Sequence, residues 1–369
     1  MHITYFTHSL VSDWNHGNAH FLRGLMRALQ GMGHTCLALE PAGGWSRSNL
    51  LEERGEAAVA EFHADFPDLQ SRSYSSPEDW EPALDASDIV IVHEWTDPQL
   101  IAEIGRRRAK GAGFRLFFHD THHRAVTKPE EMAALDLSGF DAVLAFGDTL
   151  AERYRAMGWG DRVFTWHEAA DDSLFHPHPE IAPERDLIWV GNWGDDERSA
   201  ELREFLIRPV AELGLSADVH GVRYPEEARA ALKEAGIAYR GSIANARVPE
   251  AFARHRVTVH VPRRPYAEAL PGIPTIRPFE ALACGIPLVS APWEDAEGLL
   301  RPGTDYLTVR DGAEMTRQLT HVLHDKALAA ELAASGRETI AARHTCRHRA
   351  EELMDIIERV GQPAREAAE

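Results

Sequence analysis

The 369-residue sequence contains few cysteines and no long apolar run. Only Cys36, Cys284 and Cys346 occur, and their wide spacing fits neither a disulfide framework nor a four-cysteine zinc site. No stretch reaches the roughly 18 consecutive apolar residues of a membrane-spanning helix, and no secretion signal is visible at the N-terminus. These absences predict a protein of a reducing compartment, placed in the cytoplasm, without stable membrane insertion.

The sequence also lacks an excess of positive charge. Its 58 Asp and Glu residues against 39 Lys and Arg give a formal charge of -19. Such a field repels phosphate backbones and anionic headgroups, so nucleic acid is not an expected partner. An anionic ligand must therefore bind in a local group of backbone N–H groups and a few arginines.

Short apolar runs alternate with longer stretches of helical periodicity, and this pattern predicts an α/β fold with parallel sheets. The length exceeds what one ordinary core fills, which favours two lobes. The expected strands lie at residues 2–7, 35–41, 88–93, 114–119, 142–146, 162–166, 186–190, 217–221, 258–261, 288–290 and 306–309.

The expected boundary between the lobes lies in FHPHPEIAPER, residues 175–185, where three prolines favour an extended connector. Residues 1–176 then form the N-terminal lobe and residues 177–345 the C-terminal lobe. Residues 346–369 are assigned to a helix that crosses back to the first lobe, followed by a loose tail.

The segment LPGIPTIRPFEALACGIPLVSAPW carries the most specific pattern. Pro278 suits the first turn of a helix and Gly285 suits its left-handed end. The helix N-terminus, around Ile276 and Arg277, offers N–H groups and a charge to a phosphate. Glu280, one turn further on, could accept hydrogen bonds from the two neighbouring hydroxyls of a ribose. A helix that is merely well capped is the alternative interpretation.

This segment resembles the EAxACGxPV stretch of retaining nucleotide-sugar glycosyltransferases of the GT-B fold. The resemblance implies two Rossmann-like lobes whose parallel sheets face each other across a cleft. It assigns Glu280 to the ribose and the backbone at Thr275, Ile276 and Arg277 to the diphosphate. The family's pattern has a second glutamate eight residues earlier, where this chain has Gly272. Whether a side chain or backbone holds the donor sugar at Gly272 is therefore open.

Further segments extend the resemblance to about residues 160–357. Residues 163–177 resemble the family's interlobe element, and residues 235–262 resemble its nucleotide-base pocket, with the backbone of Ser242 and Ile243 as the candidate base contact. With the ending RETIAARHTCRHRAEEL, the match is closest to the CgeB-like, spore-maturation-type group of bacterial glycosyltransferases.

In the N-terminal lobe, FHDTHHR follows an apolar strand. His119 and Asp120 should therefore stand at a carboxyl edge, where α/β sheets bind ligands. Since the family often has a histidine here facing the donor sugar, the resemblance makes His119 the catalytic candidate, with Asp120 beside it. A metal site formed with His122 and His123 is disfavoured, because four adjacent ligand-type residues seldom converge on one ion.

Weaker signals lie in two loops. Gly17, before the first helix, allows close approach of backbone to a phosphate or acceptor, although it also fits a simple turn. The family often has an arginine and a lysine that reach the phosphates. Here Asn192 replaces the arginine, Arg198 could supply the lysine's charge, and Arg263 is a further candidate. An ion pair with the acidic neighbours at 195–197 is the alternative for Arg198.

The resemblance implies a hexosyltransferase that moves a sugar from a UDP-sugar or GDP-sugar to a hydroxyl acceptor, with retention of configuration and without cofactor or divalent metal. The physical problem is departure of a diphosphate anion, which helix-terminal N–H groups and arginines ease. A nucleotide-sugar epimerase and a non-catalytic envelope or spore-surface scaffold are the alternatives. A dinucleotide oxidoreductase is disfavoured, because no GxGxxG follows the first strand. The base, sugar, acceptor and oligomeric state are left open.

Overall fold

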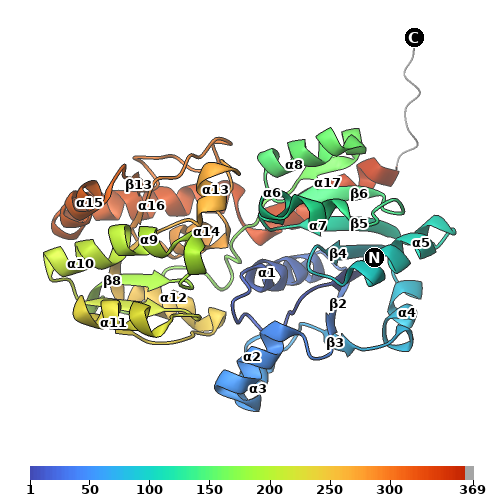
Figure 1. Cartoon of the computed structure of the whole chain (residues 1–369), viewed down its shortest axis with the longest axis horizontal. Coiled ribbons are helices and arrows are strands. Elements are labelled where there is room, and N and C mark those ends of the chain that lie inside the picture. The colour runs from blue at the N-terminus through green and yellow to red at the C-terminus, as the bar shows by residue number, and fades with distance from the viewer. Residues whose placement is uncertain (362–369) are drawn as a thin grey trace, which may run out of the picture. The chain divides into compact units, whose positions relative to one another are not determined.

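The computed structural model describes residues 1–361, and the tail expected to be loose lies outside them. The chain forms two units. Unit 1 contains Met1–Glu168 and the last helix, α17 (Cys346–Gly361), and unit 2 is Ala169–Thr345. In Figure 1, unit 1 runs from blue to green and includes α17 in red. The division falls after Glu168 and not at 176, so the proline-rich connector belongs to unit 2.

Unit 1 contains a parallel sheet of seven strands. They are β1 (His2–Phe6), β2 (Thr35–Pro41), β3 (Ser71–Tyr74), β4 (Ile89–His93), β5 (Arg115–Asp120), β6 (Ala142–Ala145) and β7 (Val163–Thr165). Their order is β3-β2-β1-β4-β5-β6-β7. The chain builds outward from β1 to β3 and then returns to the other side of β1, so the order reverses between β1 and β4. In open α/β sheets, ligands bind at the carboxyl ends of the strands at such a reversal.

The amino-acid sequence of each strand reflects how deeply the strand is buried. All five positions of β4, IVIVH, are buried, as expected for a central strand covered on both faces. At the edge, β3 has the sequence SRSY and no buried position. The sequence pattern missed β3 because it has no apolar run.

The helices of unit 1 include a pair formed by the two ends of the chain. The helices besides α17 are α1 (Asn18–Gly31), α2 (Trp45–Arg54), α3 (Glu56–Asp65), α4 (Pro77–Asp85), α5 (Pro98–Ala109), α6 (Arg124–Thr127), α7 (Pro129–Ala133) and α8 (Asp148–Tyr154). The Sγ of Cys346, at the start of α17, lies 3.8 Å from the carbonyl oxygen of Phe21 on α1. Trp166 Nε1 donates a hydrogen bond of 2.9 Å to the Arg349 carbonyl. Both contacts join α17 to unit 1.

Unit 2 repeats the design with six parallel strands. They are β8 (Arg185–Val190), β9 (Ala217–His220), β10 (Ile237–Tyr239), β11 (His255–His260), β12 (Leu288–Ser290) and β13 (Leu307–Thr308). The order β10-β9-β8-β11-β12-β13 reverses between β8 and β11. Along β8, Leu187 and Trp189 enter one apolar cluster, while Ile188 and Val190 enter another. This alternation shows that both faces of the sheet are covered.

The helices of unit 2 include the one framed in sequence by Pro278 and Gly285. They are α9 (Ser199–Leu202), α10 (Arg208–Leu213), α11 (Glu226–Glu234), α12 (Val248–Ala253), α13 (Arg264–Glu268), α14 (Ile276–Cys284), α15 (Gly312–His324) and α16 (Lys326–Arg343). Gly285 ends α14 with φ 71°, which confirms the predicted left-handed stop. Because α14 connects the parallel strands β11 and β12, its N-terminus lies at the carboxyl edge of the sheet.

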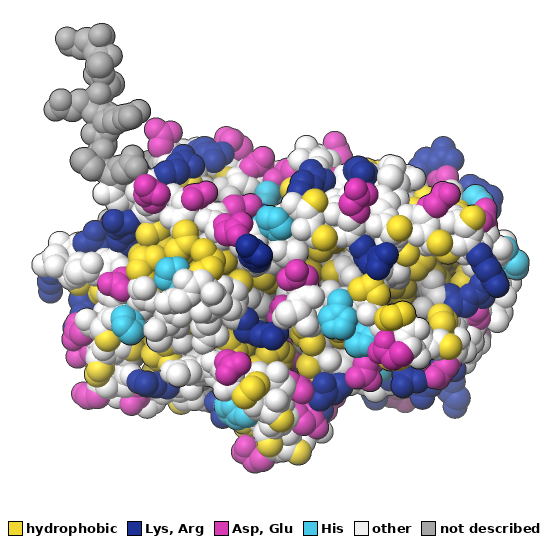
Figure 2. All heavy atoms as spheres, turned by 180° about the vertical axis from the view of Figure 1, so that it is seen from behind, with side chains coloured by type: hydrophobic (Ala, Val, Ile, Leu, Met, Phe, Trp, Pro, Cys, Tyr) yellow, Lys and Arg dark blue, Asp and Glu magenta, His cyan; other side chains and the backbone are white. Residues whose placement is uncertain are grey.

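No helix of the described residues is long and apolar enough to cross a membrane. On the face that Figure 2 shows, acidic and basic side chains are interspersed. The negative charge of the chain is therefore not gathered into a single acidic area on that face.

Candidate active site

Arg198 lies at the point in unit 2 where the strand order reverses. Its guanidinium donates to the carbonyl oxygen of Asn192 after β8 (2.7 Å) and to that of Val261 after β11 (3.2 Å). The guanidinium carbon also lies 5.1 Å from the ring centre of Trp189. Burial, and then the charge of Arg263, lower the pKa of Arg198 to about 9, so it stays charged at neutral pH.

The acidic neighbours of Arg198 bind other arginines. Asp195 pairs with Arg223 at 2.9 Å, and Glu197 pairs with Arg263 at 2.6 Å. Within residues 1–361, Arg198 itself forms no ion pair. The expected alternative of an ion pair with residues 195–197 is therefore wrong for Arg198. An anionic ligand gains more binding free energy from a partly buried guanidinium without a carboxylate partner than from one that is already paired.

The backbone conformation at the N-terminus of α14 allows a ligand to approach its N–H groups closely. Thr275 precedes the helix with φ 59° and ψ -177°, and its side chain makes no capping hydrogen bond. A positive φ is costly for a β-branched residue, and such strain clusters at functional sites. The N–H groups of Ile276 and Arg277, in the first turn, have no intrahelical acceptor and are directed to the carboxyl edge.

Glu280 is buried and fully engaged. Only 1% of it is exposed. Its Oε1 accepts from Asn245 Nδ2 at 3.0 Å, and its Oε2 accepts from Arg277 Nη1 at 2.5 Å. Arg277 therefore neutralises Glu280 in this state and does not carry an unpaired charge. A ribose that binds Glu280 must therefore displace Arg277 or Asn245 from the carboxylate.

Asn245 was missed by sequence reasoning, although it stands two residues after the candidate base contact. Ser242 and Ile243 follow β10 and are partly buried. They are held at the sheet edge by a tight crossing, in which Gly221 N–H donates to the Gly241 carbonyl at 2.9 Å. A Cβ at Gly221 would lie 2.0 Å from the carbonyl oxygen of Gly191, so the crossing requires glycine.

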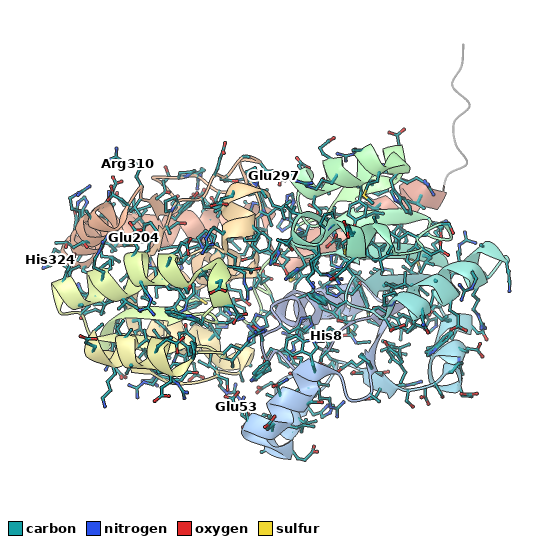
Figure 3. All side chains as sticks on the ribbon, viewed as in Figure 1. His8, Glu53, Glu204, Glu297, Arg310 and His324 are labelled. Atoms are coloured by element: carbon teal, nitrogen blue, oxygen red, sulfur yellow. The ribbon has the colours of Figure 1, made fainter. Side chains whose placement is uncertain are left out.

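Gly272 lies beside a carboxylate from another segment. Its φ of 91° favours glycine, and its N–H donates to the Glu294 carbonyl at 2.8 Å. A Cβ at Gly272 would meet Cγ of Glu297 at 2.8 Å and Oε1 at 2.9 Å. Figure 3 labels Glu297. The positive φ therefore disfavours any other residue at 272, and Glu297 occupies the space that a side chain there would enter, which the linear pattern could not predict.

In unit 1, the two catalytic candidates lie below the surface of the sheet edge. His119 is 4% exposed, with ring centres 4.9 Å from Trp166 and 5.8 Å from His93. Burial, and then the charge of His93, lower the pKa of His119 well below its usual value. Asp120 is fully buried and accepts from Tyr154 Oη at 2.7 Å and from the N–H of His122 at 3.1 Å. Burial, and then Glu94, raise the pKa of Asp120 to about 7.

His119 belongs to a row of four imidazoles that the sequence did not reveal. The ring centres of His8 and His16 are 5.0 Å apart, those of His16 and His93 6.2 Å, and His119 follows His93. His93, His119 and Asn18 line a cavity of about 10 Å³, the size of a single water molecule. The row forms because β1, β4 and β5 are adjacent and end at the same edge.

Gly17 is exposed and directly precedes α1. The loop before it is held by Arg23 of α1. This side chain donates to the Leu10 and Val11 carbonyls at 2.9 Å each and pairs with Asp13 at 3.0 Å. Gly17 is thus presented on a firm loop at the carboxyl edge of the unit 1 sheet.

Within residues 1–361, no group of three or more His, Cys, Asp and Glu side chains could hold a metal ion. The neighbours His122 and His123 instead lie ring against ring, with centres 3.9 Å apart.

Solved structures share this architecture over nearly the whole chain. Sucrose-phosphate synthase from Thermosynechococcus elongatus has 16% identity and a TM-score of 0.64, over 98% of this chain and 99% of that one. Anabaena HepE, solved with UDP and glucose, has 14% identity and a TM-score of 0.64, over 96% and 99%. S. aureus TarM, solved with UDP and an α-GlcNAc-glycerol, has 7% identity and a TM-score of 0.68, over 98% and 100%.

These likenesses establish the GT-B fold of two Rossmann-like units. Residues 198–355 match the family model described as glycosyl transferase-like, beginning at Arg198 and including α14. No curated protein matches the chain.

Proposed function

We propose that the protein is a glycosyltransferase that moves a sugar from a nucleotide-diphosphate donor to a hydroxyl acceptor with retention of configuration, as in the CgeB-like group. The observation that carries this proposal is Arg198 at the strand reversal of unit 2, a charged guanidinium that donates to two carbonyls and forms no ion pair within residues 1–361. The match of residues 198–355 to glycosyl transferase-like proteins and the UDP in structural neighbours support it.

In the proposed reaction, the bond between the anomeric carbon and the donor phosphate oxygen breaks, and the acceptor oxygen forms a bond to the same carbon. The acceptor proton leaves with the diphosphate. Negative charge thus develops on the diphosphate, where Arg198 and the N–H groups of Ile276 and Arg277 would stabilise it. Backbone at Ser242 and Ile243 would hold the base, and no divalent metal is required.

The donor sugar would be held beside Gly272 by the carboxylate of Glu297. A carboxylate accepts hydrogen bonds from sugar hydroxyls, and this one lies against the position where the chain lacks a side chain. Glu280 would hold the ribose once Arg277 moves to the phosphate. The movement of Arg277 costs little free energy, because its guanidinium exchanges one anionic partner, Glu280, for another, the phosphate.

His119 stays a catalytic prediction. Its Nε2 has no hydrogen-bond partner within residues 1–361 and the ring borders the small cavity with His93. From that buried position, His119 would orient the donor sugar through a bridging water molecule or after a movement of the four imidazole rings. Asp120 would fix the end of β5.

Calorimetric titration with UDP, GDP and their sugars tests the proposal directly. Binding of at least one nucleotide, weakened tenfold or more in Arg198→Ala and unchanged in Arg310→Ala, is the expected result. Arg310 is a matched control, since it is 83% exposed and paired with Glu314 in the same unit; Figure 3 labels it. A chain that binds none of the nucleotides would overturn the proposal in favour of a scaffold.

Product analysis with a labelled nucleotide sugar then defines the reaction. Label found in a new molecule supports transfer, whereas an isomerised nucleotide sugar identifies an epimerase. The anomeric coupling in the product's NMR spectrum tests retention, and full activity after chelator treatment tests metal independence.

A further inference from the structure

Three ring side chains converge where the strand order of unit 1 reverses. His8 follows β1, Trp95 follows β4, and β1 and β4 are the two strands on either side of the reversal. Trp45 begins α2, which follows β2. The ring centres of Trp45 and Trp95 lie 4.7 and 6.4 Å from that of His8. The three side chains therefore form one surface at the place where such sheets bind ligands.

Both tryptophans are open to solvent. Trp45 and Trp95 are each 40% exposed, and they are the two exposed tryptophans of the nine in the chain, all of which lie in its described part. Leaving a large apolar ring in water forfeits the free energy that its burial would give. Two such rings on one ligand-binding edge are typical of a surface that a ligand covers.

Trp45 is held in place before any ligand arrives. Beyond its contact with His8, its ring meets that of Trp14 edge to face, with centres 5.7 Å apart. Trp14 is fixed in turn by a hydrogen bond of 2.6 Å from its Nε1 to Glu53 on α2. Figure 3 labels His8 and Glu53.

Trp95 is equally fixed. The guanidinium of Arg124 lies 4.1 Å from its ring centre, and the ring of His122 lies 5.0 Å away. Arg124 also donates to the carbonyl oxygen of Glu94, which anchors it to the end of β4. A platform that is already ordered loses little conformational entropy when a ligand binds.

His8, which contacts both tryptophans, adds hydrogen-bonding groups that carry no charge. His8 is 7% exposed, and its Nε2 has no hydrogen-bond partner within residues 1–361. Burial, and then the charge of His93, lower the pKa of His8 to about 4, so the ring is neutral at pH 7. A neutral imidazole donates at one nitrogen and accepts at the other, as a hydroxyl group does.

We propose that Trp45, Trp95 and His8 form the acceptor site and that the acceptor is a neutral saccharide. A pyranose ring has C–H faces that pack on the electron-rich face of an indole and hydroxyls around its rim that pair with a neutral imidazole. The cation beside these side chains is Arg124, which stacks on the Trp95 ring and donates to the Glu94 carbonyl, so the surface that the three side chains themselves present carries no charge. The inference rests on the proposed function and names the acceptor class: one saccharide hydroxyl forms the new bond to the donor sugar, and its proton leaves with the diphosphate.

Binding of oligosaccharides to the full-length protein, measured with an immobilised array, tests this site. The probes are di- to tetrasaccharides of glucose, galactose, mannose and N-acetylglucosamine, the phosphorylated and uronate forms of the same sugars, and glycerol and benzyl alcohol. The variants are Trp45→Ala, Trp95→Ala and the control Trp159→Ala. Trp159 also has a guanidinium over its ring, that of Arg162 at 4.6 Å, but it lies before β7, at the opposite edge of the sheet.

The expected result is binding of at least one neutral oligosaccharide, weakened tenfold or more in Trp45→Ala and Trp95→Ala and unchanged in Trp159→Ala. Two further variants, Trp45→Phe and Trp95→Phe, should weaken binding less, because they keep an aromatic ring. An unchanged melting temperature shows that each variant is folded. Binding confined to phosphorylated, uronate or non-carbohydrate probes would overturn the proposal, as would equal binding by all variants or no binding at all.

UDP and GDP titration of the same variants separates this inference from the proposed function. If nucleotide binding persists while saccharide binding is absent or insensitive to the tryptophans, the acceptor site is wrong and the transfer proposal stands. If saccharides bind through the tryptophans but no nucleotide binds, the transfer proposal fails and a saccharide-binding surface stays.

Discussion

Unit 1 and unit 2 have parallel sheets whose strand order reverses at the same place, between their first and fourth strands. In unit 1 the reversal carries indole and imidazole rings, represented by Trp95 and the neutral His8. In unit 2 it carries Arg198, a cation whose hydrogen bonds within residues 1–361 go to two backbone carbonyls. One topology therefore builds two different sites, and the side chains after the strands decide whether the edge suits a neutral ring or an anion.

Arg198→Ala should have the largest effect on this contrast. The substitution removes the guanidinium at the strand reversal of unit 2, and hydrogen bonds to a charged group are worth about 1.5–3 kcal/mol. We expect UDP or GDP affinity to fall about 10- to 150-fold by calorimetry, with Arg198→Lys in between, because lysine keeps the charge but cannot bridge both carbonyls. Unchanged affinity in Arg198→Ala would remove the distinction between the two edges.

His119→Ala should destabilise unit 1. His119 is packed between Trp166, Phe21 and His93, so truncation leaves a cavity that costs about 2–3 kcal/mol. We expect the melting temperature to drop by about 4–10 °C. His324→Ala is the control, because this exposed histidine of α15, labelled in Figure 3, touches no such core. If His119→Ala melts like His324→Ala, the row of imidazoles does not organise the edge of unit 1.

Turnover must be compared at a temperature where His119→Ala is fully folded. A loss of turnover there at unchanged nucleotide affinity would support the catalytic prediction for His119. Full turnover would limit His119 to packing.

The sequence predicted elements whose patterns are local. The buried runs of β1 and β4 have the expected alternation with helices, and α14 begins and ends where Pro278 and Gly285 predict. The strand β3 was missed because an edge strand such as SRSY needs no apolar residues. The fold could be predicted because the apolar periodicity that distinguishes a strand from a helix is visible within short segments of the sequence.

The site was harder to predict because it depends on partners far apart in the chain. Arg198 was named from sequence, but its lack of a carboxylate depends on Arg223 and Arg263 taking its acidic neighbours. Glu297 was missed, since only the folded loop brings it against Gly272. Such pairings follow from tertiary packing and leave no spacing pattern for a reader of the sequence.

Glu297→Gln should separate sugar recognition from nucleotide recognition within unit 2. An amide keeps the shape but weakens the acceptance of hydrogen bonds from sugar hydroxyls, by about 1.5 kcal/mol. We expect turnover of the nucleotide sugar to fall about tenfold while UDP or GDP affinity is unchanged. Glu204→Gln is a matched control, because Glu204 also lies against a glycine, accepting from Gly312 N–H at 2.9 Å, and Figure 3 labels it. Equal turnover in the two variants would exclude Glu297 from the donor site.

The smallest effect should come from pH, and it sharpens the contrast between a neutral and a charged edge. The pKa of His8 in the folded chain is about 4, below its usual 6.5. Between pH 4 and 6.5 the unfolded chain is therefore protonated at His8 and the folded chain is not. His8 alone therefore lowers stability as the pH falls from 6.5 to 4. The buried Glu94 and Asp120, with pKa raised to about 8 and about 7, act in the opposite sense, so stability does not isolate His8. The KM for the acceptor isolates His8 when two proteins are compared: we expect the native protein and His8→Gln to show the same pH dependence between pH 5.5 and 8, because His8 stays neutral throughout. A step near pH 6.5 that disappears in His8→Gln would show instead that the acceptor edge carries a charge.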